Sequence, residues 1–137
     1  MSGITHQQLV NHAVEAAANA YNPYSKFSVG AALLGKNGEL FVGVNIENVS
    51  YGLTICAERS AFCAAITAGC REFEAIAIVA SSAKPPLPCG ACRQVMAEFC
   101  DGSFSIVLAT ITAPTNIQVY RLNDLLPHQF ESGSIAC

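Results

Sequence analysis

The sequence predicts an α/β domain, a three-layer sandwich in which a mixed five-stranded sheet is flanked by helices. Three observations lead to this fold class. Apolar residues recur at helical spacing near the N-terminus, two short apolar runs enclose a glycine-rich turn, and two later apolar runs alternate with helical segments. A hairpin followed by strands with crossover helices gives a sheet with both antiparallel and parallel pairs. A chain of 137 residues fits one such domain, over residues 1–137.

Local signals position each element along the chain. Thr5 or Ser2 can cap the first helix, which ends before Pro23 because proline disfavours a helical residue before it. The GKNG turn at Gly35–Gly38 joins the strands of a hairpin, and Gly69 closes the second long helix. The expected elements are a helix over 5–20, strands over 27–34 and 40–44, a helix over 54–68, a strand over 75–80, a helix from 88 or 89 to about 99, strands over 105–110 and 117–120, a short last helix capped by Asn123-Asp124, and a loose tail from about 131.

Charge and hydropathy exclude several classes of partner. The chain is 52% hydrophobic and only 12% charged, with a net charge of -3. So little charge predicts association with other copies of the chain, although a monomer with an alanine-rich core is the alternative. The Lys and Arg residues form no basic stripe, so we expect no nucleic-acid polymer as a partner. With neither a long apolar run nor a secretory signal pattern, we expect a cytoplasmic protein without membrane contact.

The cysteines are the first residues in the sequence that indicate a metal-binding or reactive site. Seven cysteines in a cytoplasmic chain indicate metal binding or thiol chemistry rather than disulfides. Cys89 and Cys92 share one face of a predicted helix start, and Cys56 begins another helix. The strands before these helices end near the same edge of the sheet, so the two helix starts can present three thiolates to one Zn²⁺. The remaining cysteines have no assigned role: Cys63, Cys70, Cys100 and Cys137.

The number of protein ligands separates a catalytic zinc from a structural one. Structural sites have four protein ligands, whereas catalytic sites have three and a water. His6, His12 and His128 lie far from the predicted helix starts, so the sequence favours the open, catalytic site. Glu58, two residues after Cys56, faces another side of the helix start and can move a proton of the zinc-bound water. The alternative is a first-turn glutamate favoured by the helix dipole.

Arg59 fits the charge of such a site. Three thiolates on Zn²⁺ leave a net charge of -1, which makes the bound water harder to ionise than the water of a three-histidine site, whose pKa is about 7. Each pKa unit above that costs about 1.36 kcal/mol. An arginine that hydrogen-bonds the sulfurs offsets part of this cost. We expect Arg59 rather than Arg93 to do so, and an exposed helix arginine is the alternative.

Longer motifs carry a resemblance to a known family. CAE at Cys56–Glu58 and PCGAC at Pro88–Cys92 are similar to the ligand-x-Glu and Pro-Cys-x-x-Cys pattern of zinc nucleoside and nucleobase deaminases. The first ligand here is cysteine, where many relatives have histidine. YNPYSKFSVGAALL, GVNIENVSYGLTICAERSA, PCGACRQV and LLPHQF extend the match over residues 21–130. By these motifs the chain resembles the short-chain, homotetrameric cytidine deaminases.

The resemblance implies a cytidine deaminase-like fold and one Zn²⁺ per subunit. Cys56, Cys89 and Cys92 would be the zinc ligands, with Glu58 as the proton shuttle. The implied reaction is hydrolytic deamination of cytidine and 2′-deoxycytidine by a zinc-bound hydroxide, giving uridine or 2′-deoxyuridine and ammonia in pyrimidine salvage. No residue visibly reads the 2′ position, so the sequence does not rank the two substrates.

The resemblance also implies how the nucleoside is bound. Asn45 and Glu47 would hydrogen-bond the ribose 3′-hydroxyl, and Phe27 would line the base pocket. The backbone N–H of Ala57 would bind the pyrimidine carbonyl. Phe130 would reach the base bound by a neighbouring subunit of the homotetramer, and Tyr51 would also lie at a site shared between subunits. Simpler interpretations stay open, since Phe27 can be a core residue, Asn45 a turn former and Phe130 a packing residue.

Three other functions compete with this interpretation. A deaminase of another aminopyrimidine nucleoside, such as blasticidin S, would share the three thiolates and Glu58. A non-catalytic structural-zinc module would show a fourth protein ligand or a site closed to water. An RNA- or DNA-editing enzyme would need a surface for the polymer, against which the short, acidic chain argues.

Overall fold

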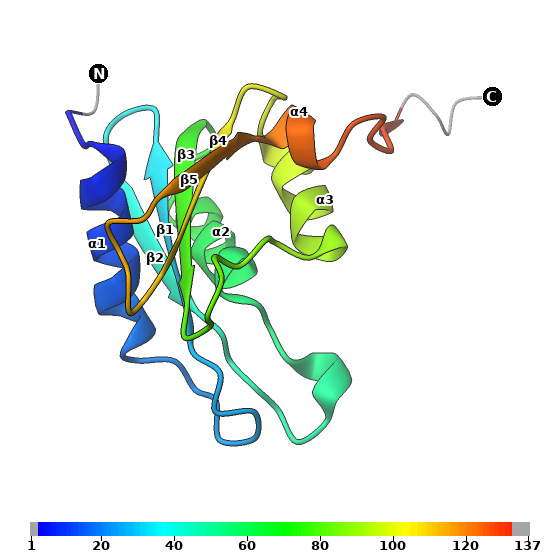
Figure 1. Ribbon diagram of the computed structural model, residues 1–137. Helices are drawn as coiled ribbons and strands as arrows, with labels where there is room; N and C mark the ends of the chain where they lie inside the picture. The colour runs from blue at the N-terminus through cyan, green and yellow to red at the C-terminus, as the bar shows by residue number, and fades with distance from the viewer. Residues whose placement is uncertain (1–2, 133–137) are drawn as a thin grey trace.

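The computed structural model describes residues 3–132, so most of the expected loose tail, including Cys137, lies outside the described residues. Helices and strands alternate along the chain as expected (Figure 1). The elements are α1 (His6–Ala17), β1 (Val29–Gly35), β2 (Leu40–Val44), the 3₁₀-helix η1 (Tyr51–Leu53), α2 (Ala57–Thr67), β3 (Phe73–Ala80), α3 (Gly90–Phe99), β4 (Ser105–Thr110), β5 (Gln118–Arg121) and α4 (Leu122–Leu125). Among residues 3–132, no helix has the length and apolar character needed to cross a membrane.

One mixed five-stranded sheet runs through the centre of the molecule, in the order β2-β1-β3-β4-β5. β3 and β4 are parallel, and every other neighbouring pair is antiparallel. The parallel pair is joined by α3, because parallel strands need a crossover connection. This arrangement confirms the predicted mixed sheet, with the hairpin β1–β2 at one edge.

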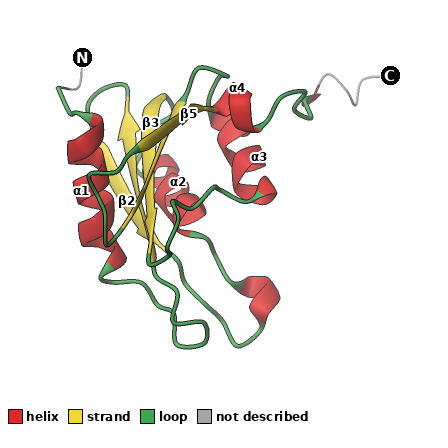
Figure 2. Ribbon diagram, in the orientation of Figure 1, coloured by secondary structure: helices red, strands yellow, loops and turns green. Residues whose placement is uncertain are grey.

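Helices cover both faces of the sheet, which confirms the three-layer sandwich (Figure 2). α1 packs on one face, and α2 and α3 pack on the other. The side chains of β3 alternate between the two cores: Ala77 and Val79 contact the α1 side, while Ile76 and Ile78 contact the α2 side. A strand buried on both faces needs apolar residues at successive positions, so it appears in the sequence as a continuous apolar run.

Three predicted helix boundaries were wrong. α4 begins at Leu122 with Arg121 as its N-cap residue, so Asn123 and Asp124 lie inside the helix instead of at its N-cap. α1 ends at Ala17 rather than near residue 20, because the chain then closes tight turns in which the Ala20 N–H donates to the Ala17 carbonyl. α2 begins at Ala57 rather than at Thr54. The preceding residues form η1 and an isolated bridge between Ile46 and Ile55, so they are not available to a helix.

Close packing of α2 on the sheet positions the start of this helix. Gly43 of β2 lies so near α2 that a Cβ at this residue would come within 2.4 Å of the Ala61 nitrogen and 2.5 Å of the Ala57 carbonyl oxygen. Only glycine allows this approach, because any side chain would displace the helix backbone. The far end of α2 is closed by Gly69 at a φ of 92°, as predicted.

Candidate metal and substrate site

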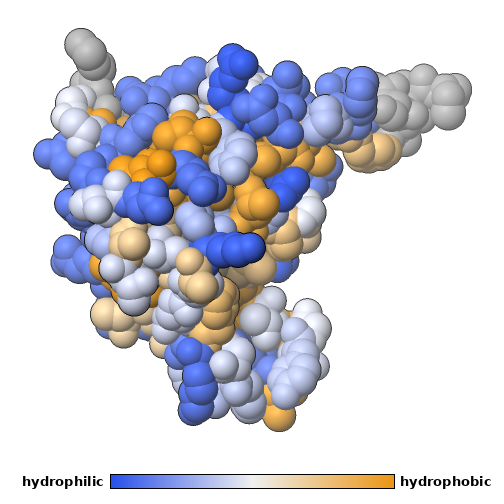
Figure 3. All heavy atoms as spheres, in the orientation of Figure 1, coloured by the Kyte–Doolittle hydropathy of each residue, from blue (hydrophilic) through white to orange (hydrophobic). Residues whose placement is uncertain are grey.

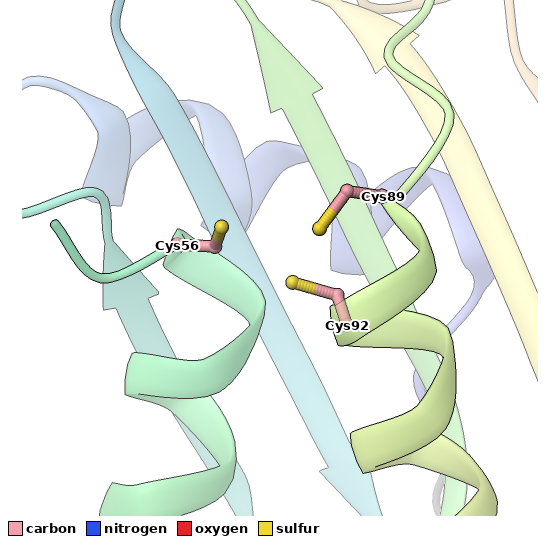
Figure 4. Close-up of side chains that lie close together, drawn as sticks. All are labelled: Cys56, Cys89 and Cys92. Atoms are coloured by element: carbon pink, nitrogen blue, oxygen red, sulfur yellow. The ribbon is translucent and has the colours of Figure 1, made fainter. Parts of the chain in front are cut away.

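Two helix starts converge on one side of the sheet and carry three cysteines. Cys56 is the N-cap residue of α2, Cys89 is the N-cap residue of α3, and Cys92 lies in the first turn of α3. Their sulfurs point into the space between the two helices (Figure 4), and all lie within 4.8 Å of one another. β2 and β3, which precede these helices, point the same way because both are antiparallel to β1.

The three sulfurs fit a zinc ion. Tetrahedral Zn²⁺ lies at about 2.3 Å from each thiolate, which corresponds to sulfurs about 3.8 Å apart. Among residues 3–132, these cysteines are the one group of three or more His, Cys, Asp or Glu side chains close enough to share an ion. With three protein donors, the fourth position of a tetrahedral ion is left for water, as in catalytic zinc sites.

The thiols are unequal in acidity. A hydrogen bond from the Cys92 thiol, followed by the neighbouring Arg59 guanidinium, lowers the pKa of Cys56 to about 5. The same hydrogen bond, together with burial and the Glu58 carboxylate, raises the pKa of Cys92. A thiol with a lowered pKa, such as that of Cys56, more readily takes the thiolate form that binds metals.

Glu58 lies directly beside the sulfurs. Its side chain is 6% exposed, and burial is the main cause that raises the pKa of this carboxyl, with the charge of Cys56 adding to it. A carboxyl group with a raised pKa holds a proton more readily than an ordinary one, which suits general acid–base chemistry.

One of the two candidate arginines contacts a sulfur. The Arg59 Nη2 donates to the Cys56 sulfur at 3.3 Å, and this hydrogen bond raises the pKa of the guanidinium. The Arg59 Nε is buried and has no hydrogen-bond partner in the described part of the chain. Arg93 instead donates to two backbone carbonyls, those of Pro88 and Leu125. The contact is therefore the one expected of Arg59.

A cavity of about 290 Å³ opens beside the cysteines. Its volume is at the lower limit of typical small-molecule sites. Sequence-predicted residues in its wall are Phe27, Asn45, Glu47, Cys56, Ala57, Glu58 and Cys89. The wall also contains residues that the sequence did not indicate: Val29, Thr54, Ile55, Ile78, Pro86 and Leu87. Pro86 and Leu87 lie within three residues of Cys89, and this proximity is the feature of the sequence that could have indicated their place in the cavity wall.

Asn45 organises the backbone of the cavity wall. Its Oδ1 accepts from the Val29 N–H at 3.0 Å, and its Nδ2 donates to the Phe27 carbonyl at 2.7 Å. The Asn45 side chain thus bridges the backbone of Phe27 and Val29, where β1 begins. Phe27 is half exposed beside the cavity rather than in the core.

Glu47 holds the loop on the other side of the cavity. It accepts from the backbone N–H groups of Tyr24 and Ser25 at 3.0 and 3.1 Å, and from the Ser25 hydroxyl. The Ser25 hydroxyl is the main cause that lowers the pKa of Glu47. The sequence did not indicate this partnership, because 22 residues separate Ser25 from Glu47.

Two of the predicted substrate-binding residues, Tyr51 and Phe130, lie outside the cavity. Tyr51 is 76% exposed and lines an adjacent hollow with Tyr24, Ser25, Glu47 and Thr54. Phe130 is 63% exposed and lies beside α3, where its carbonyl accepts from Gln94 at 3.5 Å. A single chain therefore does not bring Phe130 to its own cysteines.

Comparisons with known proteins agree with this geometry. The sequence model of the family described as cytidine and deoxycytidylate deaminase zinc-binding region matches residues 4–108. A cytidine deaminase from Halalkalibacterium halodurans is 49% identical over 90% of this chain and 92% of that protein. One from Sporosarcina psychrophila is 45% identical over 95% of this chain and 94% of that protein. The crystal structure of cytidine deaminase from Burkholderia pseudomallei superposes with a TM-score of 0.88 at 46% identity, covering 93% of this chain and all of that one.

Proposed function

This chain belongs to the family of zinc-binding cytidine and deoxycytidylate deaminases, and from this premise we propose that it deaminates cytidine and 2′-deoxycytidine hydrolytically. The products are uridine or 2′-deoxyuridine and ammonia, and the reaction serves pyrimidine salvage. The observation that carries the proposal is the buried carboxyl group of Glu58, in the wall of one cavity with Cys56 and Cys89. A structural-zinc module has no use for such a group.

The chain's own residues supply the proton transfers. Zn²⁺, when bound by Cys56, Cys89 and Cys92, lowers the pKa of a water and so supplies the nucleophile for C4 of the pyrimidine. Glu58 takes a proton from that water and delivers it to N3 of the base. It then takes the remaining proton from the oxygen added at C4 and gives it to the amino group, so that the C4–N bond breaks, ammonia leaves and a C4 carbonyl remains. Its raised pKa helps Glu58 to hold a proton between the two transfers.

Residues in the wall of the cavity orient the nucleoside. One hydrogen of the Asn45 amide donates to the Phe27 carbonyl, and the other can serve the ribose 3′-hydroxyl, with Glu47 accepting from that hydroxyl. Phe27 packs on the base, and the Ala57 N–H binds the pyrimidine carbonyl. The hydrogen bonds that Asn45 and Glu47 make to the cavity wall hold both side chains ready for the ligand.

The reaction is tested with a panel of substrates. Absorbance of cytidine, 2′-deoxycytidine, cytosine, CMP, adenosine and blasticidin S is followed with the purified protein, and its zinc content is measured. Turnover of the two cytosine nucleosides, with about one zinc per chain, is expected. Turnover of blasticidin S alone would establish the alternative deaminase. No turnover by zinc-loaded protein would contradict the enzymatic function.

Arg59 supports the charge balance of the sulfurs in this proposal. Its hydrogen bond withdraws charge from the Cys56 thiolate, so the ion remains a stronger Lewis acid. Arg59→Ala should slow turnover by about 10- to 100-fold while zinc stays bound. The matched control is Arg71→Ala, since Arg71 donates to backbone carbonyls at the other end of α2. Wild-type turnover in Arg59→Ala would remove this role.

We further propose that the chain works as a cytoplasmic homotetramer with sites shared between subunits. Apolar side chains on the surface support this assembly: on the face that Figure 3 shows, hydrophobic residues lie among the polar ones. A groove between α2 and α3 is lined by Arg59, Phe62, Cys63, Ile66, Thr67, Val95 and Phe99, and the large exposed side chains include Val49, Tyr51, Leu53 and Phe130. These exposed groups lose contact with water when copies associate.

Mixed assemblies test the shared site. Light scattering gives the number of copies in solution, and a monomer that is fully active would contradict the assembly. Phe130→Ala should raise KM if Phe130 contacts a neighbouring subunit's base. When Phe130→Ala and Glu58→Gln chains are refolded together, some sites receive intact Glu58 and a neighbouring intact Phe130. Those sites should show wild-type KM, whereas simple addition of the two activities would refute sharing.

A further inference from the structure

The loop before α3 has little means of holding itself in place. It ends at Cys89, whose side chain is exposed, whereas Cys92 is buried within the helix. Three of the four preceding residues, Pro85, Pro86 and Pro88, have no amide N–H and cannot donate a backbone hydrogen bond. The position of the Cys89 sulfur therefore depends on something outside this loop.

Arg93 supplies that support from one turn further along α3. Its Nε donates to the Pro88 carbonyl at 2.7 Å, and its Nη1 donates to the Leu125 carbonyl at 2.8 Å. Within residues 3–132, the bond from Arg93 is the one hydrogen bond to the backbone of residues 85–88. Arg93 thus links the loop to the end of α4, where Leu125 lies 32 residues after Arg93 in sequence.

The Pro88 carbonyl is a sensitive point for the cysteine that follows it. This carbonyl and the Cys89 nitrogen belong to one planar peptide unit. Fixing the direction of the carbonyl fixes the orientation of that plane, from which the Cα–Cβ bond of Cys89 projects toward the other sulfurs. Cys92 needs no such support, because the hydrogen bonds of α3 already hold its backbone.

We propose that Arg93 is a positioning residue for the metal centre, which fastens the peptide before Cys89 to α4 and so holds the Cys89 sulfur in place for the ion. Arg93 touches neither the sulfurs nor the cavity. Its planar guanidinium serves two carbonyls at once, a geometry that the single ammonium of lysine does not reproduce. Loss of this link should let Cys89 leave the ion more easily.

Zinc release tests the proposal without relying on turnover. Zinc-loaded protein is mixed with an excess of a chromogenic chelator, and the rate of zinc transfer is recorded. Arg93→Ala should release zinc about 10- to 100-fold faster than the wild type, the range found for partners that orient metal ligands. In cobalt-substituted protein, the absorption bands of the thiolate-bound ion should weaken or shift in Arg93→Ala.

Arg71→Ala is the matched control. Arg71 also donates to two backbone carbonyls, those of Ile66 and Cys70, but at the far end of α2. This variant removes the same kind of side chain and the same charge. It should release zinc within twofold of the wild-type rate, and thermal melts of both variants show whether their losses of stability are comparable.

Arg93→Lys distinguishes the effect of the two hydrogen bonds of Arg93 from the effect of its positive charge. It keeps the positive charge near the sulfurs but not the two-carbonyl link, so we expect zinc release to stay several-fold faster than in the wild type. It also serves as the test variant if Arg93→Ala does not fold. Release at the wild-type rate in Arg93→Lys would overturn the proposal, and so would equal rates in Arg93→Ala and Arg71→Ala.

Discussion

The start of α1 differs from the starts of α2 and α3. α1 begins with a complete capping box: the Thr5 hydroxyl accepts from the Gln8 N–H at 3.1 Å, and the Gln8 side chain accepts from the Thr5 N–H at 2.9 Å. α2 and α3 each begin with a cysteine whose side chain makes no capping hydrogen bond. Cys56 and Cys89 instead direct their sulfurs toward a shared ion site.

A helix end can thus be capped for stability or left uncapped to bind a metal. A good N-cap contributes about 1 kcal/mol to stability, because it satisfies an N–H that has no partner within the helix. The two helices at the metal centre give up this contribution, and α2 also buries the carboxyl group of Glu58. Positive helix ends that are left uncapped favour thiolates nearby, so what is lost in stability serves the site.

Replacing Glu58 should give the largest effect. Glu58→Gln keeps the size and burial of the side chain but cannot accept a proton, so turnover should fall by at least about 10³-fold with zinc retained. Because burial raises the pKa of this carboxyl, the glutamine variant should be no less stable at pH 7 than the wild type. Steady-state kinetics, zinc analysis and thermal melts check this. Wild-type turnover would refute the role of Glu58.

A serine in place of Cys56 should turn the start of α2 from a metal-binding end into a capped end. Cys56→Ser introduces a good N-cap and removes a thiolate, so the protein should lose zinc and turnover. In metal-free protein, Cys56→Ser should be about 1 kcal/mol more stable than Cys56→Ala, which lacks a cap. Denaturant unfolding of the two variants measures the difference. Equal stabilities would show that this helix end is not improved by a cap.

The capping box of α1 should matter for stability alone. Thr5→Ala should lower the free energy of unfolding by about 1 kcal/mol, since the Gln8 N–H loses its acceptor, while turnover and zinc content stay at the wild-type level. Thr5→Ser, which retains the hydroxyl, is the control and should lose much less. A fall in the kcat of folded Thr5→Ala would contradict the separation between α1 and the site.

The smallest effect concerns the loop held by Glu47. The pKa of Glu47 is lowered in the folded chain, chiefly by the Ser25 hydroxyl. A group with a depressed folded pKa stabilises the protein above its unfolded pKa of about 4.5, and that contribution is lost as the pH falls through the folded value. Glu47→Gln should therefore flatten the acid side of the stability profile, as measured by denaturant unfolding between pH 7 and pH 3. An unchanged acid profile would count against this linkage.

Prediction from the sequence succeeded where neighbours along the chain decide the outcome. The turn Gly35–Gly38, the cap at Gly69 and the strand over 105–110 need only local signals. It failed at the end of α1 and the start of α2. There, the chain's turns and the bridge between Ile46 and Ile55 override helical periodicity.

The sequence by itself determined the layered fold and the chemical groups of the site. Burial requires an apolar face at helical or strand spacing, and CAE and PCGAC put thiols and a carboxyl group at two helix starts. Only the tertiary structure decided that Arg93 holds the Pro88 carbonyl and that Glu47 binds Ser25. Such partners depend on how loops and helices approach in space, and residue spacing along the chain carries no record of those distances.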